Sequence, residues 1–354
     1  MDFVPLIDAI GEPAVAVLGG AVLGLVFGIA AQRSGFCTRA AVIHATRDGN
    51  LRSLAVWAAG FATAIFLVQL AIFSGNLSTV ETRFFSTAQS LSGALIGGLL
   101  FGVGMALARG CVSRLTVLAA SGNMRAIFSL IVMTFVGWAT YAGVLIPARD
   151  AVATLYSTAS IGSNEVLAQL GAGRSGGVMI GAVLLAAALG LATLARASIG
   201  RVIGGAAVGI AVAGGWLFTY ELSSQVFDPI AIESLSYIRP YASTLMLALG
   251  RTETVGMDQG LLIGTLAGAA VAAIASREFR IATFAEPGVP SIWRYAIGAA
   301  LMGFGGILAV GCTVGAGLTG GSVLAVSSLI ALCAMAFGAA VTDRVVDAAP
   351  KTAN

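Results

Sequence analysis

Nine long apolar stretches dominate the sequence and limit what the chain can fold into. Crossing a lipid bilayer takes about 20 apolar residues in a helix, and somewhat fewer where the helix is broken. Only 10% of the 354 residues are charged, against about 25% in an ordinary soluble domain. The sequence therefore predicts an all-α polytopic membrane protein and excludes a soluble enzyme, a disordered chain and a nucleic-acid-binding protein. The expected spans are residues 14–31, 53–73, 91–108, 126–147, 176–195, 202–218, 259–275, 295–310 and 323–341.

Basic residues are distributed unevenly between the loops, and this predicts the orientation. The N-terminal segment is acidic and lacks the basic region of a cleaved signal peptide, so we expect the first span to stay in the mature protein. With the N-terminus outside and the C-terminus inside, most of the 19 basic residues face inward, as the positive-inside rule requires. These inner residues are Arg33, Arg39, Arg47, Arg52, Arg109, Arg114, Arg125, Arg196, Arg201, Arg277, Arg280, Arg294, Arg344 and Lys351.

A pattern that ends in cysteine recurs along the chain. Each copy has a small residue, a glycine four positions later and a cysteine nine positions after that. The three copies are GLVFGIAAQRSGFC at 24–37, GLLFGVGMALARGC at 98–111 and AALMGFGGILAVGC at 299–312. A fourth copy, GAAVGIAVAGGWLF at 205–218, has Phe218 in the cysteine position. Four copies in one register indicate an internal repeat.

The repeat divides the single transmembrane domain into two halves. The copies fall on the first, third, sixth and eighth spans, so residues 14–147 form one half and residues 201–341 the other. Residues 148–200 connect the halves and include the fifth span, and residues 342–354 form a C-terminal tail. A single connecting span makes the second half enter the membrane from the opposite side. The expected architecture is therefore the inverted pseudo-twofold repeat of many transporters.

A polar break and a short, weakly apolar segment follow each cysteine copy. These segments are 38–46, 112–121 and 313–320. We expect each to be a short re-entrant helix after a loop, because irregular backbone at membrane depth must be buried in protein or line a cavity. The loops at Cys37 and Cys111 should dip from the inside, and those at Phe218 and Cys312 from the outside. Three thiols would then lie along one central axis.

Arginines, a glycine and a hydroxyl flank the three cysteines. These candidate path residues are Arg33 and Arg39 at the first loop, Arg109 and Arg114 at the second, and Gly311 and Thr313 at the third. A guanidinium at membrane depth usually marks a pathway, and it binds oxyanions through paired hydrogen bonds. Thiols are soft and polarisable, which suits an anion that itself has a soft atom. At Phe218 we expect an apolar plug or gate, with simple helix packing as the alternative.

The loops RSGFCTRA, RGCVSR and GCTVGAGLTGGS resemble those of the YeeE/YedE family of sulfur-transport membrane proteins, in order and over nearly the whole chain. The resemblance implies an hourglass of nine spanning helices with short re-entrant helices, in the bacterial inner membrane. It implies thiosulfate uptake without a cofactor or metal, with the ligand passing from Cys312 to Cys111 and leaving by Cys37. It also implies a small cytosolic sulfur-carrier protein as a partner.

Other functions compete with this one. A membrane thiol oxidoreductase or sulfurtransferase needs a reactive cysteine of low pKa, often beside a second one, and the sequence has no Cys-x-x-Cys. A soft-metal transporter would use thiolates for Cu(I) or zinc, but the excess of arginine near the loops disfavours a cation. Transport of a selenium species or another sulfur species stays open. Cys333 lies in an apolar span outside the loops, where we expect a small buried hydrophobic residue.

Overall fold

The computed structural model describes residues 2–226, 230–251 and 254–347, and its secondary-structure elements in these ranges are all helices. Nine long, apolar segments of the described chain are suited to cross a membrane, which confirms the predicted class and number of spans. Lys351 lies outside the described residues. The long helices are α2 (Glu12–Ser34), α4 (Arg52–Phe73), α5 (Leu91–Leu107), α7 (Met124–Ala142), α10 (Arg174–Leu194), α11 (Ile199–Ser223), α13 (Met257–Ala275), α14 (Ile292–Leu308) and α15 (Val326–Val346).

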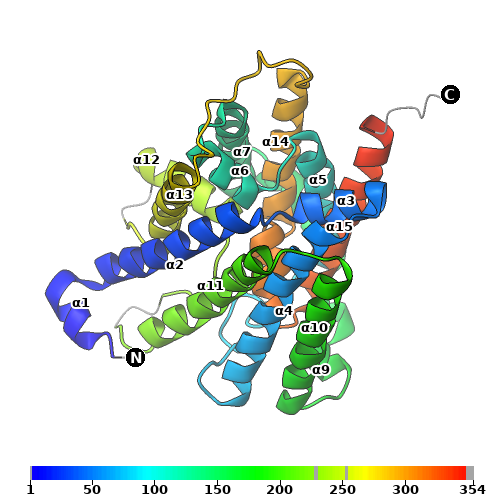
Figure 1. Ribbon diagram of the computed structural model, residues 1–354. Coiled ribbons are helices and arrows are strands. Elements are labelled where there is room, and N and C mark those ends of the chain that lie inside the picture. Colours follow the sequence, from blue (N-terminus) through cyan, green and yellow to red (C-terminus); the bar gives the residue numbers. More distant parts are fainter. Residues whose placement is uncertain (1, 227–229, 252–253, 348–354) are drawn as a thin grey trace.

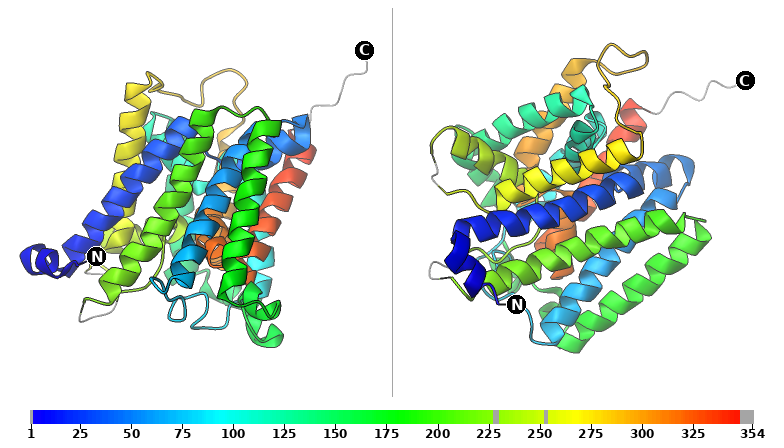
Figure 2. Two further views of the ribbon diagram at one scale, coloured as in Figure 1. Left: turned by 60° about the horizontal axis from the view of Figure 1, so that its bottom comes forward. Right: turned by 60° about the vertical axis from the view of Figure 1, so that its left-hand side comes forward.

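The nine long helices form two rows. In the first row α10 packs on α4, α4 on α11, α11 on α2, and α2 on α13. These five helices run side by side in the left view of Figure 2. In the second row α15 packs on α5, α5 on α14, and α14 on α7. The described ends of the chain lie on opposite sides of the view in Figure 1.

Four short helices fill the space between the two rows. α3 (Thr38–Asp48) contacts α4 and α15, and α12 (Ile238–Ala248) contacts α13 and α7. α6 (Val112–Ala120) also contacts α13 and α7, whereas the π-helix η2 (Thr313–Gly320) contacts α4 and α15. Each short helix therefore touches at least one long helix from each row. The connecting segments hold α1 (Val4–Ile10), α8 (Ile146–Ala153), η1 (Thr158–Ile161) and α9 (Val166–Gln169).

The contacts between helices have the pattern that a twofold repeat requires. A twofold axis that superposes α2 on α11 and α4 on α13 also superposes the pair α2–α13 on the pair α11–α4. Both of these pairs are in contact. Likewise α5–α15 exchanges with α14–α7. The same exchange relates α3 to α12 and α6 to η2. The inversion of the two halves across a membrane stays a prediction.

The predicted break at Phe218 is wrong. α11 runs without interruption from Ile199 to Ser223, so Phe218 lies inside a helix, with its ring centroid 5.5 Å from that of Phe3. The cysteine loops each have a glycine one or two residues before the cysteine, whereas Trp216 and Leu217 precede Phe218. Without such a residue at the end of the apolar run, the helix continues. The chain next enters a short helix at Tyr237, which is the N-cap of α12.

Glycines let the backbones of α2 and α13 come into direct contact. A Cβ atom placed on Gly264 would lie 2.0 Å from the carbonyl oxygen of Ala21, and one on Gly24 would lie 2.3 Å from that of Leu261. Only hydrogen fits at these separations. Membrane helices gain little from hydrophobic burial against each other, so such close packing is a main source of their association.

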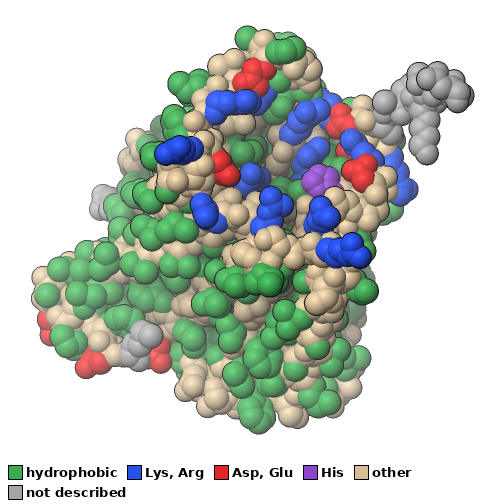
Figure 3. Space-filling model, viewed as in Figure 1, with side chains coloured by type: hydrophobic (Ala, Val, Ile, Leu, Met, Phe, Trp, Pro, Cys, Tyr) green, Lys and Arg blue, Asp and Glu red, His purple; other side chains and the backbone are tan. Residues whose placement is uncertain are grey.

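Charged side chains gather at the end of the molecule where α15 ends, as Figure 3 shows. There the guanidinium of Arg294 donates two hydrogen bonds, of 2.8 and 2.6 Å, to the carboxylate of Asp347. Arg47 pairs with Asp343, a side chain that is almost fully buried. These ion pairs attach the end of α15 to α14 and to α3. This end corresponds to the predicted inner side, although the orientation itself stays a prediction.

Candidate functional site

Each of the three loop cysteines caps the N-terminus of a short helix. Cys37 precedes α3, Cys111 precedes α6 and Cys312 precedes η2. The first-turn backbone N–H groups of a helix have no partner inside the helix, and the helix dipole makes this end positive. The fold thus places every loop thiol beside a group of donors that favours an anion.

The backbone turns in the same way before all three cysteines. Two residues ahead of each cysteine the chain adopts the left-handed conformation, at Gly35 (φ 68°), Arg109 (φ 59°) and Val310 (φ 57°). This turn ends the preceding long helix and lets the chain start a short helix in a new direction. A β-branched residue is strained in this conformation, so the surroundings of Val310 must hold it there.

The three thiols are buried and close to one another. The thiols of Cys37 and Cys111 are close enough to influence each other electrostatically, and the Cys111 Sγ is 3.5 Å from the Ser113 Oγ. Cys111 also adjoins Thr313 from the third loop, and Cys312 lies near enough to interact electrostatically with Cys111. All three side chains are at most 8% exposed. The three cysteine loops therefore lie close together with Cys111 between the other two, whereas the fourth loop predicted at Phe218 is not formed.

The sulfur of Cys312 lies beside several backbone groups. The N–H of Gly315 donates to Cys312 Sγ over 3.4 Å, and the backbones of Val314 and Tyr237 are close enough to interact with the same thiol. Tyr237 caps α12 and was not expected from the sequence to lie in this site. Its phenol bonds the hydroxyl of Thr265, with 2.8 Å between the oxygens. α12 is therefore a fourth short helix at this site, and its N-cap residue, Tyr237, lies beside Cys312.

Two buried hydroxyl groups near Cys312 have no hydrogen-bond partner within the part of the chain that the structure describes. They belong to Thr313, which is fully buried, and to Ser236, which is 8% exposed. Thr313 adjoins the Cys111 thiol without a hydrogen bond of normal geometry, and Ser236 faces Gly315, where a Cβ would lie 2.4 Å from the Ser236 Oγ. An unpaired buried hydroxyl is costly. Each of these hydroxyls is therefore a donor that the described part of the chain leaves unused.

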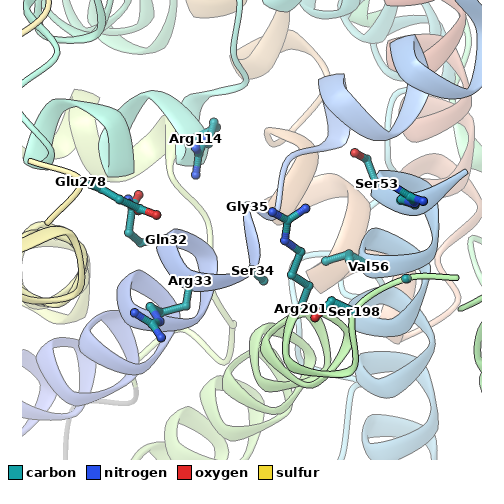
Figure 4. A pocket seen from close by; sticks show the side chains of 12 residues that line it. Gln32, Arg33, Ser34, Gly35, Ser53, Val56, Arg114, Ser198, Arg201 and Glu278 are labelled. Atoms are coloured by element: carbon teal, nitrogen blue, oxygen red, sulfur yellow. The ribbon is translucent and has the colours of Figure 1, made fainter. Parts of the chain in front are cut away.

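The structure separates the four arginines predicted at the first two loops. Arg33 and Arg114 line one pocket of about 340 Å³, shown in Figure 4. Arg109 lines a different cavity of about 140 Å³. Arg39 interacts electrostatically with Asp343 and Asp347, and its Nε atom is buried without a hydrogen-bond partner among the described residues. The four arginines therefore lie in three separate surroundings, and only Arg33 and Arg114 share one.

Among Phe218, Gly311 and Cys333, only Gly311 directly adjoins a loop cysteine. Phe218 packs against Phe3 and over Gly19. Gly311 belongs to the turn before Cys312, where a Cβ would meet the backbone nitrogen of Ala316 at 2.5 Å. Cys333 is exposed on α15, so the expectation that it is buried is wrong. Its place in an apolar span gives it a position that lipid would cover.

Three charged residues around the start of α12 form a compact ion-pair cluster. Arg239 on α12 pairs with Glu233 and, over 3.3 Å, with Asp258 at the start of α13. Burial by itself lowers the pKa of Arg239, but the two carboxylates outweigh burial and hold that pKa above its ordinary value. The cluster therefore fixes the start of α12, and with it Tyr237, next to Cys312.

Arg83, in the segment between α4 and α5, is a site residue that the sequence did not reveal. Its guanidinium carbon lies 4.8 Å from the ring centroid of Phe84, and its Nε atom is buried with no hydrogen-bond partner in the described chain. Burial lowers the pKa of Arg83, and the side chain interacts electrostatically with Glu233 and Cys312. Arg83 lies far from every cysteine in the sequence. Its relation to Cys312 is therefore apparent only from the folded structure.

Two rows of spanning helices enclose short helices that begin at buried loops. This arrangement is typical of multi-pass membrane transport proteins. The comparisons with known proteins agree and go further. The chain belongs to the sulphur transport family, which matches residues 33–341. It is also similar to the thiosulfate transporter TsuA of Spirochaeta thermophila, with 26% identity over 329 residues that cover 88% of this chain and 93% of the relative.

These findings confirm the family resemblance that the cysteine loops indicated. The chain is a membrane transporter of sulfur compounds, and its family and its relative are transporters, not enzymes. The nine apolar helices and the family also confirm a multi-pass protein of the bacterial inner membrane. The family assignment therefore disfavours the thiol oxidoreductase and the soft-metal transporter.

Proposed function

We propose that the protein takes up thiosulfate, or a closely related small sulfur anion, along a path that runs from Cys312 past Cys111 to Cys37. The convergence of three buried thiols, each at the N-terminus of a different short helix, supports this proposal. The name of the relative, a thiosulfate transporter, supports the choice of ligand. A path built from segments far apart in the sequence suits a ligand that passes between helices.

The two ends of thiosulfate call for different partners. Its sulfonate oxygens accept hydrogen bonds from backbone N–H groups, from guanidinium groups and from the unpaired hydroxyls of Ser236 and Thr313. Its terminal sulfur is soft and accepts weak hydrogen bonds from neutral thiols. Weak contacts serve transport, because each site must release the anion to the next. Cys111, which adjoins both other loops, is the natural intermediate step.

A small cytosolic sulfur-carrier protein is the proposed partner at the inner end. A carrier that binds transported thiosulfate there would keep the free concentration inside low and so favour net uptake. Lipid is the other partner, around the apolar faces of the nine spanning helices.

The direct test is uptake of radiolabelled thiosulfate by proteoliposomes that contain the purified protein. We expect uptake above that of protein-free liposomes, and inhibition by unlabelled thiosulfate but not by equal sulfate added outside. Cys333→Ala is the matched control, because Cys333 is an exposed cysteine away from the path. Absence of uptake by a folded protein, or competition by selenium anions alone, would overturn the assignment of thiosulfate.

Arg83→Gln is expected to raise the thiosulfate concentration at half-maximal uptake about 10-fold, because one charge-assisted hydrogen bond to the entering anion is lost. The maximal rate should change little, since Arg83 does not adjoin the central thiol. Arg174→Gln, an exposed arginine at the start of α10 on the same predicted outer side, should behave like the wild type. Equal effects of the two substitutions would show that Arg83 contributes only general surface charge.

A further inference from the structure

A pocket of about 340 Å³ lies beside the first cysteine loop, at the predicted inner end of the path. The end of α2, the starts of α4 and α11, the helix α6 and the segment after α13 all contribute to its walls. Four arginines line it, namely Arg33, Arg52, Arg114 and Arg201. Two of them, Arg52 and Arg201, are distant in the sequence from every cysteine. In Figure 4 Arg201 extends from α11 toward Gly35, and Arg114 approaches from the opposite side.

Most of the positive charge of this pocket is not balanced by nearby carboxylates. Arg33 donates to the hydroxyl of Ser276 over 2.7 Å, Arg52 to the carbonyl of Ala195 over 3.4 Å, and Arg114 to a backbone carbonyl over 3.5 Å. None of the four arginines forms an ion pair within the described residues. The one carboxylate in the lining, that of Glu278, accepts a hydrogen bond of 2.7 Å from Gln32 instead.

The pocket adjoins the loops that carry Cys37 and Cys111. Gly35 and Arg114 belong to its walls, two residues before Cys37 and three residues after Cys111. An anion that leaves Cys37 toward this end therefore enters the field of the arginines. The volume lies at the lower end of small-molecule sites, which run from about 300 to 1,000 Å³, so a tetrahedral anion fits together with part of its water shell. The hydroxyl of Ser198 offers a further donor, whereas that of Ser34 already donates to the carbonyl of Ala30 and that of Ser53 bonds the imidazole of His44.

We propose that this pocket is a second anion-binding site, which takes a divalent tetrahedral oxyanion such as sulfate or thiosulfate from the inner solution. An anion held there occupies the exit and repels the next anion that arrives from Cys37, so accumulated oxyanions slow further uptake. This kinetic consequence rests on the proposed function, whereas the binding site itself does not. The pocket would thus couple uptake to the supply of oxyanions inside the cell.

Proteoliposomes of one orientation, loaded with sodium sulfate or with sodium gluconate at equal ionic strength, test the kinetic consequence. We expect internal sulfate to lower the initial rate of thiosulfate uptake several-fold in the wild type. The double variant Arg52→Gln/Arg201→Gln should need at least tenfold more internal sulfate for the same inhibition. Arg344→Gln removes an exposed arginine from the same end of the molecule but outside the pocket, and should keep wild-type sensitivity.

Chemical modification provides a readout that does not depend on transport. Phenylglyoxal reacts with arginine side chains, and mass spectrometry of the purified wild-type protein can measure modification at Arg52, Arg201 and Arg344. Sulfate should protect the first two and leave Arg344 reactive. Equal sulfate sensitivity of all variants, or equal modification with and without sulfate, would overturn the proposal. A wild type that shows protection but no thiosulfate uptake would instead contradict the proposed function and leave the site established.

Discussion

Cys111→Ala is expected to lower the initial rate of thiosulfate uptake at least about 100-fold, equivalent to roughly 2.7 kcal/mol. Cys111 holds the middle position, since its thiol adjoins Cys37 on one side and Thr313 on the other. Alanine leaves a gap in the row of soft partners, and the anion must then cross from the third loop to the first without one. Uptake into proteoliposomes, normalised to folded protein, measures the effect.

Two further variants separate chemistry from structure in this experiment. Cys111→Ser keeps a donor of similar size but replaces the soft sulfur, so its rate should lie between those of the alanine variant and the wild type. Cys333→Ala makes the same atomic change at an exposed position and should leave uptake unchanged. A Cys111→Ala variant that transports at the wild-type rate while remaining folded would remove the central thiol from the path.

The features that the sequence predicted correctly are the local ones. Hydropathy is summed over adjacent residues, so nine spans could be identified without knowledge of their neighbours. The cysteine loops were equally readable, because a small residue, a glycine and a cysteine recur at fixed spacing and a helix begins directly after each cysteine. In both cases the sequence pattern lies in the same segment as the helix or loop that it predicts.

The fourth short helix shows where this approach fails. The repeat register pointed to Phe218, but the second half inserts a long connection before its short helix begins at Tyr237. A fixed spacing cannot detect an insertion of that kind. A signal was nonetheless present, since Tyr237 is followed two residues later by Arg239, as Cys37 is by Arg39.

The remaining site residues depend on tertiary contacts that no local pattern encodes. Arg83 interacts electrostatically with Cys312 although the two are far apart in the sequence, and Arg52 and Arg201 meet at the pocket because α4 packs on α11. In the sequence Arg52 and Arg201 resemble any other positive residue at the inner end of a span. Their common pocket becomes visible only when the two rows of helices are assembled.

Gly264→Val is expected to prevent stable folding, with loss of the monodisperse protein and of most thermal stability. A Cβ at this position would lie 2.0 Å from the carbonyl oxygen of Ala21 and 2.8 Å from that residue's carbonyl carbon, so α2 and α13 would have to separate. Backbone atoms cannot move aside as a flexible side chain can. Separation would also displace Gly24 and Gly28, which contact α13 backbone in the same way, and so disturb the helix that leads into the Cys37 loop.

Gly264→Ala and Gly190→Ala form the matched pair that tests this explanation. Both add a single methyl group to a spanning helix, but a Cβ on Gly190 would meet no atom within 4 Å. Alanine is the better helix former by about 1 kcal/mol, so Gly190→Ala should be neutral or slightly stabilising. Gly264→Ala should lower the melting temperature in detergent and reduce the folded yield, because overpacking a tight contact costs about 1–3 kcal/mol or more. If both alanine variants melted like the wild type, the close approach of α2 and α13 would not be a determinant of stability.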